Sequence, residues 1–458
     1  MIALTISLLA NPVLAVDTAK AKPATNSASA MLESCVACRI VLAPSTGTNQ
    51  FDQEVLQAQR KVKTDSTPGA SLEQLGWLYV ANARRANDAG FYKLAEQCAA
   101  CLDKINPHSS EALLLRGHVM HNLHQFKEAE AVARELVATR ELGFDHGLLG
   151  DALMEQGRLT EAAESYQRMV DLKPGLQAYA RIAHLRWLKG DLAGAIEVME
   201  MATHAASPRD PESLAWVYVR LGGYLFQSGD RIKAGNACTI ALEHQPNCGP
   251  AFSLQGRLLL AAEKTPAALV PLRRAVALLP LPETQWLLAD ALRLNNREEE
   301  ARTVEKELLT SGVMEDPRSF SLYLATRGEQ TERAVRLAEA ELKSRTDVFT
   351  YDALAWALHA AGKTNDAQRN MERALAEGTE DARLFFHAAI IAAAAGDPPG
   401  SESWAKKTAP LAHLLLPSER NYLQNLVGSA KNSVANALAH PDSKTISPDG
   451  RNLSAGGN

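Results

Sequence analysis

The chain has 458 residues, of which 46% are hydrophobic and only 5% aromatic, and a formal net charge of −5 from 48 basic and 53 acidic residues. Heavy use of alanine and leucine favours helices over sheets, and the near balance of charge argues against a nucleic-acid-binding protein or a polybasic membrane surface. No stretch of about 20 apolar residues follows the N-terminus, so we expect no membrane span in the mature chain.

The N-terminus resembles an export signal. Residues 1–16 (MIALTISLLANPVLAV) are apolar and end near a small-residue cleavage site at 13–15. The usual basic segment is missing, so a tail that is apolar by chance is the alternative. With a working signal we expect a protein of the periplasm or the cell exterior, and without one a cytoplasmic protein. Residues 17–71 are expected to form an N-terminal linker and transition region that contains a cysteine pair.

Residues 143–174 have the pattern of two short amphipathic helices that fold back on each other. Gly157 interrupts the first helix and Pro174 ends the second. Small residues at Gly150 and Ala162 let the two helix backbones approach closely. One such hairpin cannot bury its own apolar face, so a stable fold needs neighbouring copies.

Copies of this hairpin recur along the chain. The alanine that opens each second helix returns at intervals of 34, 33, 33, 39, 34, 33, 33 and 33 residues, and the long interval contains an inserted loop at 206–211. A period near 33 residues that is kept over nine copies predicts an array of helical repeats. The nine alanines are Ala95, Ala129, Ala162, Ala195, Ala234, Ala268, Ala301, Ala334 and Ala367.

This pattern resembles the tetratricopeptide repeat, which combines a Leu-Gly pair, small residues, aromatic residues and a closing proline. Residues 143–174, 215–248 and 348–380 match it most fully. The resemblance covers residues 72–416 and implies an all-α, right-handed superhelical solenoid of about nine to ten helix-turn-helix repeats. Beyond it, we expect a capping helix at 417–439 that covers the open end of the array.

Residues 440–458 are rich in glycine, serine, asparagine and proline, so we expect a disordered tail there.

In proteins that carry this repeat, the first helices line a concave groove. The resemblance therefore implies a groove that holds a peptide or helix of a partner protein. Aromatic and arginine side chains, which carry much of the binding energy at interfaces, are frequent at the positions that point away from the core. The expected groove residues are His118, His121, Asp151, Met154, Arg181, His184, Trp187, Trp216, Val219, Arg220, Phe226, Arg257, Trp286, Asp290, Arg293, Phe349, Asp352, Trp356 and His359.

One known variant of this groove is absent. Repeats that grip the C-terminal carboxylate of chaperones carry lysine and asparagine at fixed groove positions. The equivalent positions of this chain hold other residues, namely Leu114, Gly147, Ala180, Val219, His118, Asp151, His184 and Gly223. We therefore do not expect a chaperone adaptor of that kind.

Two Cys-x-x-Cys pairs need a separate explanation. Cys35 and Cys38 have redox-motif spacing, but Arg39 replaces the histidine that covalent haem attachment requires. We expect this pair to form a disulfide or an accessible dithiol. Cys98 and Cys101 are expected to be small packing residues on one helix face, and a four-cysteine zinc site built from both pairs is the less favoured alternative.

No catalytic motif, phosphate-binding loop or zinc-helix motif occurs in the sequence. His118 and His121 share a helix without a third ligand at suitable spacing. We expect no enzyme, no cofactor, no bound metal and no nucleic-acid partner. The main hypothesis is a non-catalytic protein-interaction scaffold in an exported assembly. The alternative is a redox- or metal-linked protein in which Cys35 and Cys38 carry the chemistry and the repeats dock it.

Overall fold

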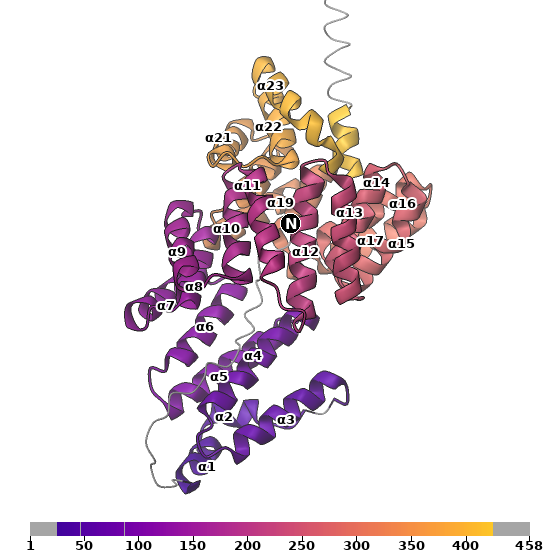
Figure 1. Cartoon of the computed structure of the whole chain (residues 1–458). Coiled ribbons are helices and arrows are strands. Elements are labelled where there is room, and N and C mark those ends of the chain that lie inside the picture. The colour runs from indigo at the N-terminus through magenta and orange to yellow at the C-terminus, as the bar shows by residue number, and fades with distance from the viewer. Residues whose placement is uncertain (1–24, 46, 87, 425–458) are drawn as a thin grey trace, which may run out of the picture.

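The computed structural model describes residues 25–45, 47–86 and 88–424. The expected export signal at 1–16 and the tail at 440–458 lie outside these residues, as does most of the expected capping helix at 417–439. Of that helix, residues 417–424 are described and are helical. Within the described part of the chain, every regular element is a helix (Figure 1).

Three helices precede the repeats, namely α1 (Thr25–Ser34), α2 (Val36–Val41) and α3 (Gln50–Thr64). The first helices of the hairpins are α4 (Gly69–Ala86), α6 (Ser110–Asn122), α8 (Gly143–Glu155), α10 (Leu176–Leu188), α12 (Pro211–Gln227), α14 (Gly249–Ala261), α16 (Pro282–Leu294), α18 (Pro317–Arg327), α20 (Val348–Ala360) and α22 (Ala382–Ala394). The second helices are α5 (Gly90–Ile105), α7 (Phe126–Thr139), α9 (Leu159–Leu172), α11 (Leu192–His204), α13 (Arg231–His244), α15 (Thr265–Leu278), α17 (Glu298–Glu315), α19 (Thr331–Ser344), α21 (Thr364–Leu375) and α23 (Pro398–Thr408), and a 3-10 helix, η1 (Ala409–Leu414), follows them. The helices α4 to α23 thus make ten hairpins, which confirms the predicted all-α, right-handed solenoid of about nine to ten repeats.

The repeat register holds through the whole array. All nine alanines that mark the second helices are 0% exposed. An alanine at this position lets the second helix approach the first, because its side chain is a single methyl group. The approach is close at Gly150, where an added Cβ would lie 2.3 Å from a ring carbon of the buried Tyr166.

Helices α1 to α3 pack against the first hairpin. Helix α2 lies on α5, and Cys38 forms a disulfide with Cys101 across this interface. The predicted pairing of Cys35 with Cys38 is therefore wrong, and so is the assignment of Cys101 as a simple packing residue. Cys35 and the buried Cys98 keep free thiols. Spacing along the sequence favoured the local pair, but the packing of α2 on α5 brings a more distant partner to Cys38.

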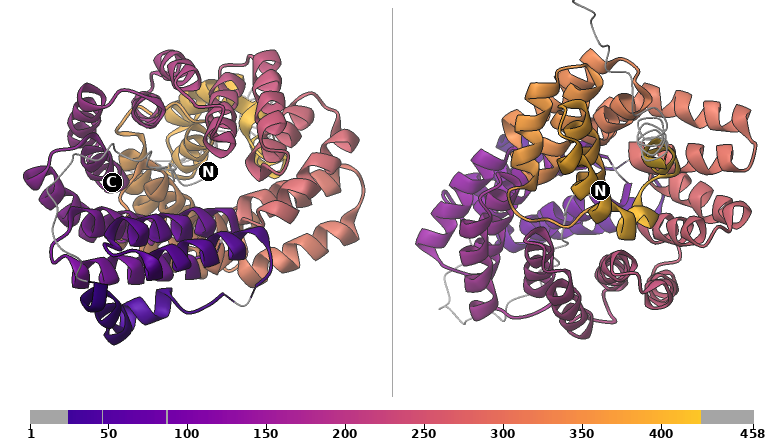
Figure 2. Two further views of the ribbon diagram at one scale, coloured as in Figure 1. Left: turned by 60° about the horizontal axis from the view of Figure 1, so that its bottom comes forward. Right: turned by 90° about the horizontal axis from the view of Figure 1, so that it is seen from above.

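The hairpins wind around a common axis (Figure 2), and after one turn of the superhelix the chain contacts itself. At the first of these contacts, the turn after α8 touches the loop between α19 and α20. The backbone N–H of Thr346 donates to the Glu155 carbonyl over 3.1 Å, and its hydroxyl donates to the Gln156 carbonyl over 2.7 Å. The Arg345 guanidinium also pairs with the Glu155 carboxylate at 2.8 Å.

The second contact lies one hairpin further on. The turn after α10 meets the loop before α22, where the Thr379 hydroxyl donates to the Leu188 carbonyl over 2.5 Å. Gln227, at the end of α12, donates to the backbone carbonyl of Glu380 in the same loop. These bonds join positions 153 to 191 residues apart, so the array is closed on itself and does not leave an open groove.

Two turn glycines make this close approach possible. Gly157 and Gly190 have left-handed backbones, with φ of 70° and 79°. A Cβ on Gly157 would lie 2.4 Å from the Thr346 carbonyl oxygen, and one on Gly190 would lie 2.5 Å from that of Gly378. Gly362 is a turn glycine of a later hairpin with φ of 74°, but nothing lies within 4 Å of the corresponding Cβ.

This difference predicts that Gly157→Ala destabilises the protein more than Gly362→Ala does. Both substitutions impose left-handed backbone strain of roughly 1–2 kcal/mol. Only the first also presses a methyl group against the backbone of the other turn, which adds about 1–3 kcal/mol. Urea denaturation followed by circular dichroism measures the free energy of unfolding of both variants, and equal losses would show that the two turns do not touch in solution.

The disulfide gives a second expected outcome. Cys101→Ser should lower the free energy of unfolding by roughly 2–4 kcal/mol, because the bridge restricts the unfolded chain, whereas Cys35→Ser should leave it unchanged.

Alkylation of the unfolded, unreduced chain should label four of its six cysteines. Peptide mapping should then find Cys38 linked to Cys101, and a linked peptide that contains Cys35 would contradict this assignment.

Candidate functional site

The first helices of the hairpins face the superhelix axis and enclose two adjoining cavities. The smaller, of about 160 Å³, lies where the two turns meet. The larger, of about 300 Å³, extends from α12 to α22. Trp187, Arg220, Arg318 and Phe349 line both. We refer to the two cavities together as the channel.

One wall of the channel is aromatic. The indole of Trp187 (α10) stacks on Phe349 (α20) with ring centroids 5.6 Å apart, and it lies 6.0 Å from the ring of Tyr224 (α12). Its N–H donates to the Gln227 side chain over 2.7 Å, which fixes the orientation of the ring. Because two turns of the superhelix supply the facing rings, this wall depends on the closure of the array.

Trp216 (α12) adds an accessible ring to the larger cavity. Of the four tryptophans expected in the groove, it alone is partly exposed, while Trp187, Trp286 and Trp356 are buried. A partner that enters the channel would therefore meet Trp216 before the deeper rings.

Ion pairs between successive elements hold the walls in place. Arg318 (α18) pairs with Asp347 at 2.9 Å, and Arg257 (α14) pairs with Glu283 (α16) at 2.5 Å. Both pairs are largely shielded from water, so removing one partner leaves a poorly compensated charge, which is destabilising. The pairs therefore fix the spacing of the helices that line the channel.

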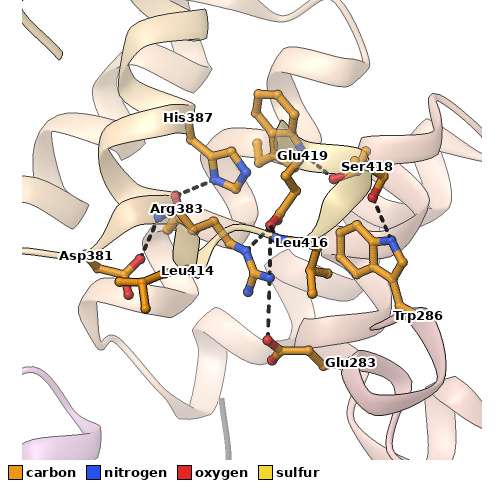
Figure 3. Close-up of polar contacts among 12 residues, drawn as sticks. Glu283, Trp286, Asp381, Arg383, His387, Leu414, Leu416, Ser418 and Glu419 are labelled. Atoms are coloured by element: carbon orange, nitrogen blue, oxygen red, sulfur yellow. Dashed lines mark hydrogen bonds and ion pairs between the residues drawn. The ribbon is translucent and has the colours of Figure 1, made fainter. Parts of the chain in front are cut away.

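A segment that we name the C-terminal strap, residues 409–424, lines one side of the larger cavity, and Figure 3 shows polar contacts that hold it in place. The strap reaches α16, where the Trp286 indole donates to the Ser418 hydroxyl over 3.0 Å and Ser418 donates to the Asp290 carboxylate over 2.6 Å. Burial raises the pKa of Asp290 to about 6, although the two donors of Ser418 act in the opposite direction.

Glu419 is the buried anchor of the strap. Its carboxylate accepts from Arg383 Nε over 2.6 Å and from the Leu416 backbone N–H over 2.8 Å. Its side chain is 1% exposed, and Leu416 beside it is fully buried. Glu419 and Leu416 are thus packed as part of the core, and the strap narrows the channel.

The structure brings part of the expected groove to the channel. Ten predicted residues line it, namely Met154, His184, Trp187, Trp216, Val219, Arg220, Phe226, Arg257, Phe349 and Asp352. The expectation that these residues are accessible is wrong for most of them, because the second turn of the superhelix and the strap cover them. Trp216, Val219, Arg220 and Arg257 remain partly exposed.

The other predicted groove residues do not line the channel. Arg181 pairs with Asp151 at 2.6 Å between adjacent first helices, where both are buried. Arg293 pairs with Glu305 on the second helix of its own hairpin, and Trp286 and Asp290 hold the strap. His118, His121, Trp356 and His359 also pack away from the channel, and burial lowers the pKa of both His118 and His121.

Many residues that line the channel were not predicted, and among them are Tyr224, Arg318, Arg345, Arg383 and Glu419. Tyr224 lies four residues from Arg220 on the same helix, so helical spacing was a usable signal for it. Arg345 and Glu419 lie outside the first helices and carry no repeat signature. Only the path of the superhelix brings them to the channel.

Two negative findings apply to the described residues alone. None of the helices there has both the length and the apolar character that a membrane span requires. No group of three or more histidine, cysteine, aspartate or glutamate side chains there is arranged to hold a metal ion.

The comparison with protein families agrees with the repeat pattern. The tetratricopeptide repeat family model matches residues 147–211, 236–312 and 353–412. Similar solved structures include the APC/C hetero-tetramer Cut9-Hcn1, at 13% identity over 80% of this chain and 68% of that chain with a TM-score of 0.42. The human IFIT1 dimer with m7Gppp-AAAA matches at 14% identity over 79% of this chain and 86% of that chain with a TM-score of 0.46. YrrB, described as a tetratricopeptide repeat protein with an unusual peptide-binding site, matches at 18% identity over 42% of this chain and 95% of that chain with a TM-score of 0.26. A comparison with curated proteins finds no match.

The strap predicts a large difference between two glutamate substitutions. Glu419→Gln removes a buried charge that Arg383 requires, so we expect a loss of about 3 kcal/mol in the free energy of unfolding. Glu402→Gln on α23 breaks only an exposed pair with Lys406, whose side chains are 69% and 73% exposed, and should change stability by less than about 0.5 kcal/mol. Urea denaturation measures both values, and hydrogen exchange of the strap amides should rise only in Glu419→Gln. Unchanged exchange in that variant would mean that the strap does not depend on this ion pair.

Proposed function

We propose that the chain is a tetratricopeptide repeat protein, as the match of residues 147–211, 236–312 and 353–412 to that family supports, and that it is a non-catalytic scaffold that holds an extended segment of a partner protein in the channel. Stacked helical repeats present extended concave surfaces to which other proteins bind. The role assigned to the channel is the specific part of the proposal.

The observation that carries the proposal is the larger cavity, with its volume of about 300 Å³ and the partly exposed Trp216 and Arg220 in its wall. Tryptophan and arginine are the side chains that most often dominate binding energy at interfaces. An extended segment places successive side chains on opposite sides of its backbone, so it can contact the aromatic wall and the opposite wall of the cavity at the same time.

We also infer that the protein works in an oxidising compartment outside the cytoplasm. The disulfide between Cys38 and Cys101 supports this, because disulfides persist in such compartments and are rare in the cytosol. The apolar stretch at 1–16 points in the same direction. The alternative of a redox-active Cys35–Cys38 pair loses support, since Cys38 is bonded elsewhere and both bridge cysteines are 0% exposed, out of reach of an exchanging thiol.

The proposal is tested by selecting short free peptides on the immobilised full chain and measuring the affinity of the best binder. Trp216→Ala should weaken this peptide about tenfold or more, because it removes an accessible aromatic contact from the cavity wall. Trp404→Ala is the matched control, since Trp404 is also half-buried but lies on α23 outside the channel. Circular dichroism should show both variants folded. If no peptide is selected, or if both variants lose affinity equally, the channel is not the binding site.

A further inference from the structure

Arg220 is an arginine whose hydrogen-bonding capacity is largely unused. It projects from α12 into both cavities. Its Nη2 donates to Nδ1 of His184 over 3.0 Å and to the Tyr224 hydroxyl over 3.2 Å. Its Nε is buried and, within the described part of the chain, has no hydrogen-bond partner. A buried donor without an acceptor costs free energy, so this atom marks a place where a ligand can supply one.

The charge of Arg220 is also uncompensated. His184 faces it as an uncharged acceptor, because burial first and the nearby Arg220 guanidinium second hold the pKa of His184 well below its usual value. Tyr224 offers only a hydroxyl and its ring, which lies 5.4 Å from the guanidinium carbon. Among the described residues, no carboxylate lies within ion-pair distance of Arg220.

The other arginines of the channel wall show a different pattern. Each of the buried or half-buried ones has a carboxylate within 2.9 Å, in the pairs Arg257–Glu283, Arg318–Asp347, Arg345–Glu155 and Arg383–Glu419. Arg373 lies at the rim, exposed and over the ring of Tyr351. Arg220 is thus the half-buried position in this wall where the expected carboxylate is missing.

We propose that Arg220 anchors a carboxylate of the segment that binds in the channel, either an aspartate or glutamate side chain or the chain terminus. This rests on the proposed scaffold function. The planar guanidinium has two edges that suit a carboxylate, one formed by Nε with Nη2 and one by Nη1 with Nη2. Trp187 and Phe349 line both cavities together with Arg220, so the same segment would place apolar groups against the aromatic wall.

The strap shows that the channel already accepts this combination of groups. It buries Leu416 and places the Glu419 carboxylate on Arg383. A partner segment at Arg220 would repeat that arrangement on α12, next to the existing one. The lysine and asparagine clamp of chaperone adaptors is absent from the chain, so recognition here relies on one arginine and its aromatic surroundings.

The experiment uses the full chain and the best peptide from the selection, synthesised in three forms. The first is unmodified, the second has its acidic side chains replaced by the corresponding amides, and the third has an amidated C-terminus. Isothermal titration gives the affinity of each form for the wild type, for Arg220→Gln and for Arg209→Gln. Arg209 is exposed in the loop before α12, so this control removes the same charge away from the channel.

We expect Arg220→Gln to weaken the unmodified peptide about tenfold or more, as for the loss of a charge-assisted hydrogen bond. One of the two amide forms should bind the wild type with the same reduced affinity, and its affinity should fall no further on Arg220→Gln. The form that behaves in this way identifies the source of the carboxylate. Arg209→Gln should bind like the wild type.

Equal affinity of all three peptide forms for the wild type would overturn the carboxylate anchor and leave the scaffold function standing, and this result needs no variant to fold. Failure to select any peptide would overturn the scaffold function and the anchor with it. A loss for Arg220→Gln that is equal for the acidic and amide forms would assign Arg220 to packing.

Discussion

Where the turn after α8 meets the loop before α20, Gly157 lies so close to the Thr346 carbonyl that a methyl group would not fit between them. In an ordinary solenoid each repeat touches only its neighbours, and the array bends and frays from its ends. Here hydrogen bonds connect positions up to 191 residues apart. Bending the array would break these hydrogen bonds, so the two superhelical turns hold each other in place and the superhelix stays closed.

Closure changes the role of the first helices. In an open superhelix, their side chains that face the axis would be free for a partner, but here the second turn of the superhelix covers many of them. Phe349 comes from that turn and stacks on Trp187, and the strap places Ser418 against Trp286 and Asp290. What remains open is the space that neither the second superhelical turn nor the strap fills, and Trp216 and Arg220 are among the residues that line it.

The features that could be predicted from the sequence are those set by contacts within one hairpin or between neighbouring hairpins. The alanine period located nine of the ten second helices because each alanine packs within its own hairpin, and Gly150 was assigned to the helix contact that Tyr166 fills. The exposure of the groove residues could not be predicted in the same way. The pitch of a superhelix is the sum of many small rotations between repeats, and none of them is visible in the spacing. For the same reason nothing near Thr346 or Ser418 indicated a contact with α8 or α16, and nothing near Cys38 indicated Cys101.

A closed superhelix also affects the energetics of binding in the channel. The ring of Trp187 is held by a hydrogen bond to Gln227 and by stacking on Phe349 of the second superhelical turn. It would therefore lose little conformational freedom when a ligand binds, and ordering it would cost little binding free energy. A segment in the channel would touch α12 from one turn and α20 from the next. Such a ligand binds only the closed form, so its binding stabilises the contact between Gly157 and Thr346 by mass action. Weakening that contact must in turn weaken binding, even though neither residue anchors the ligand.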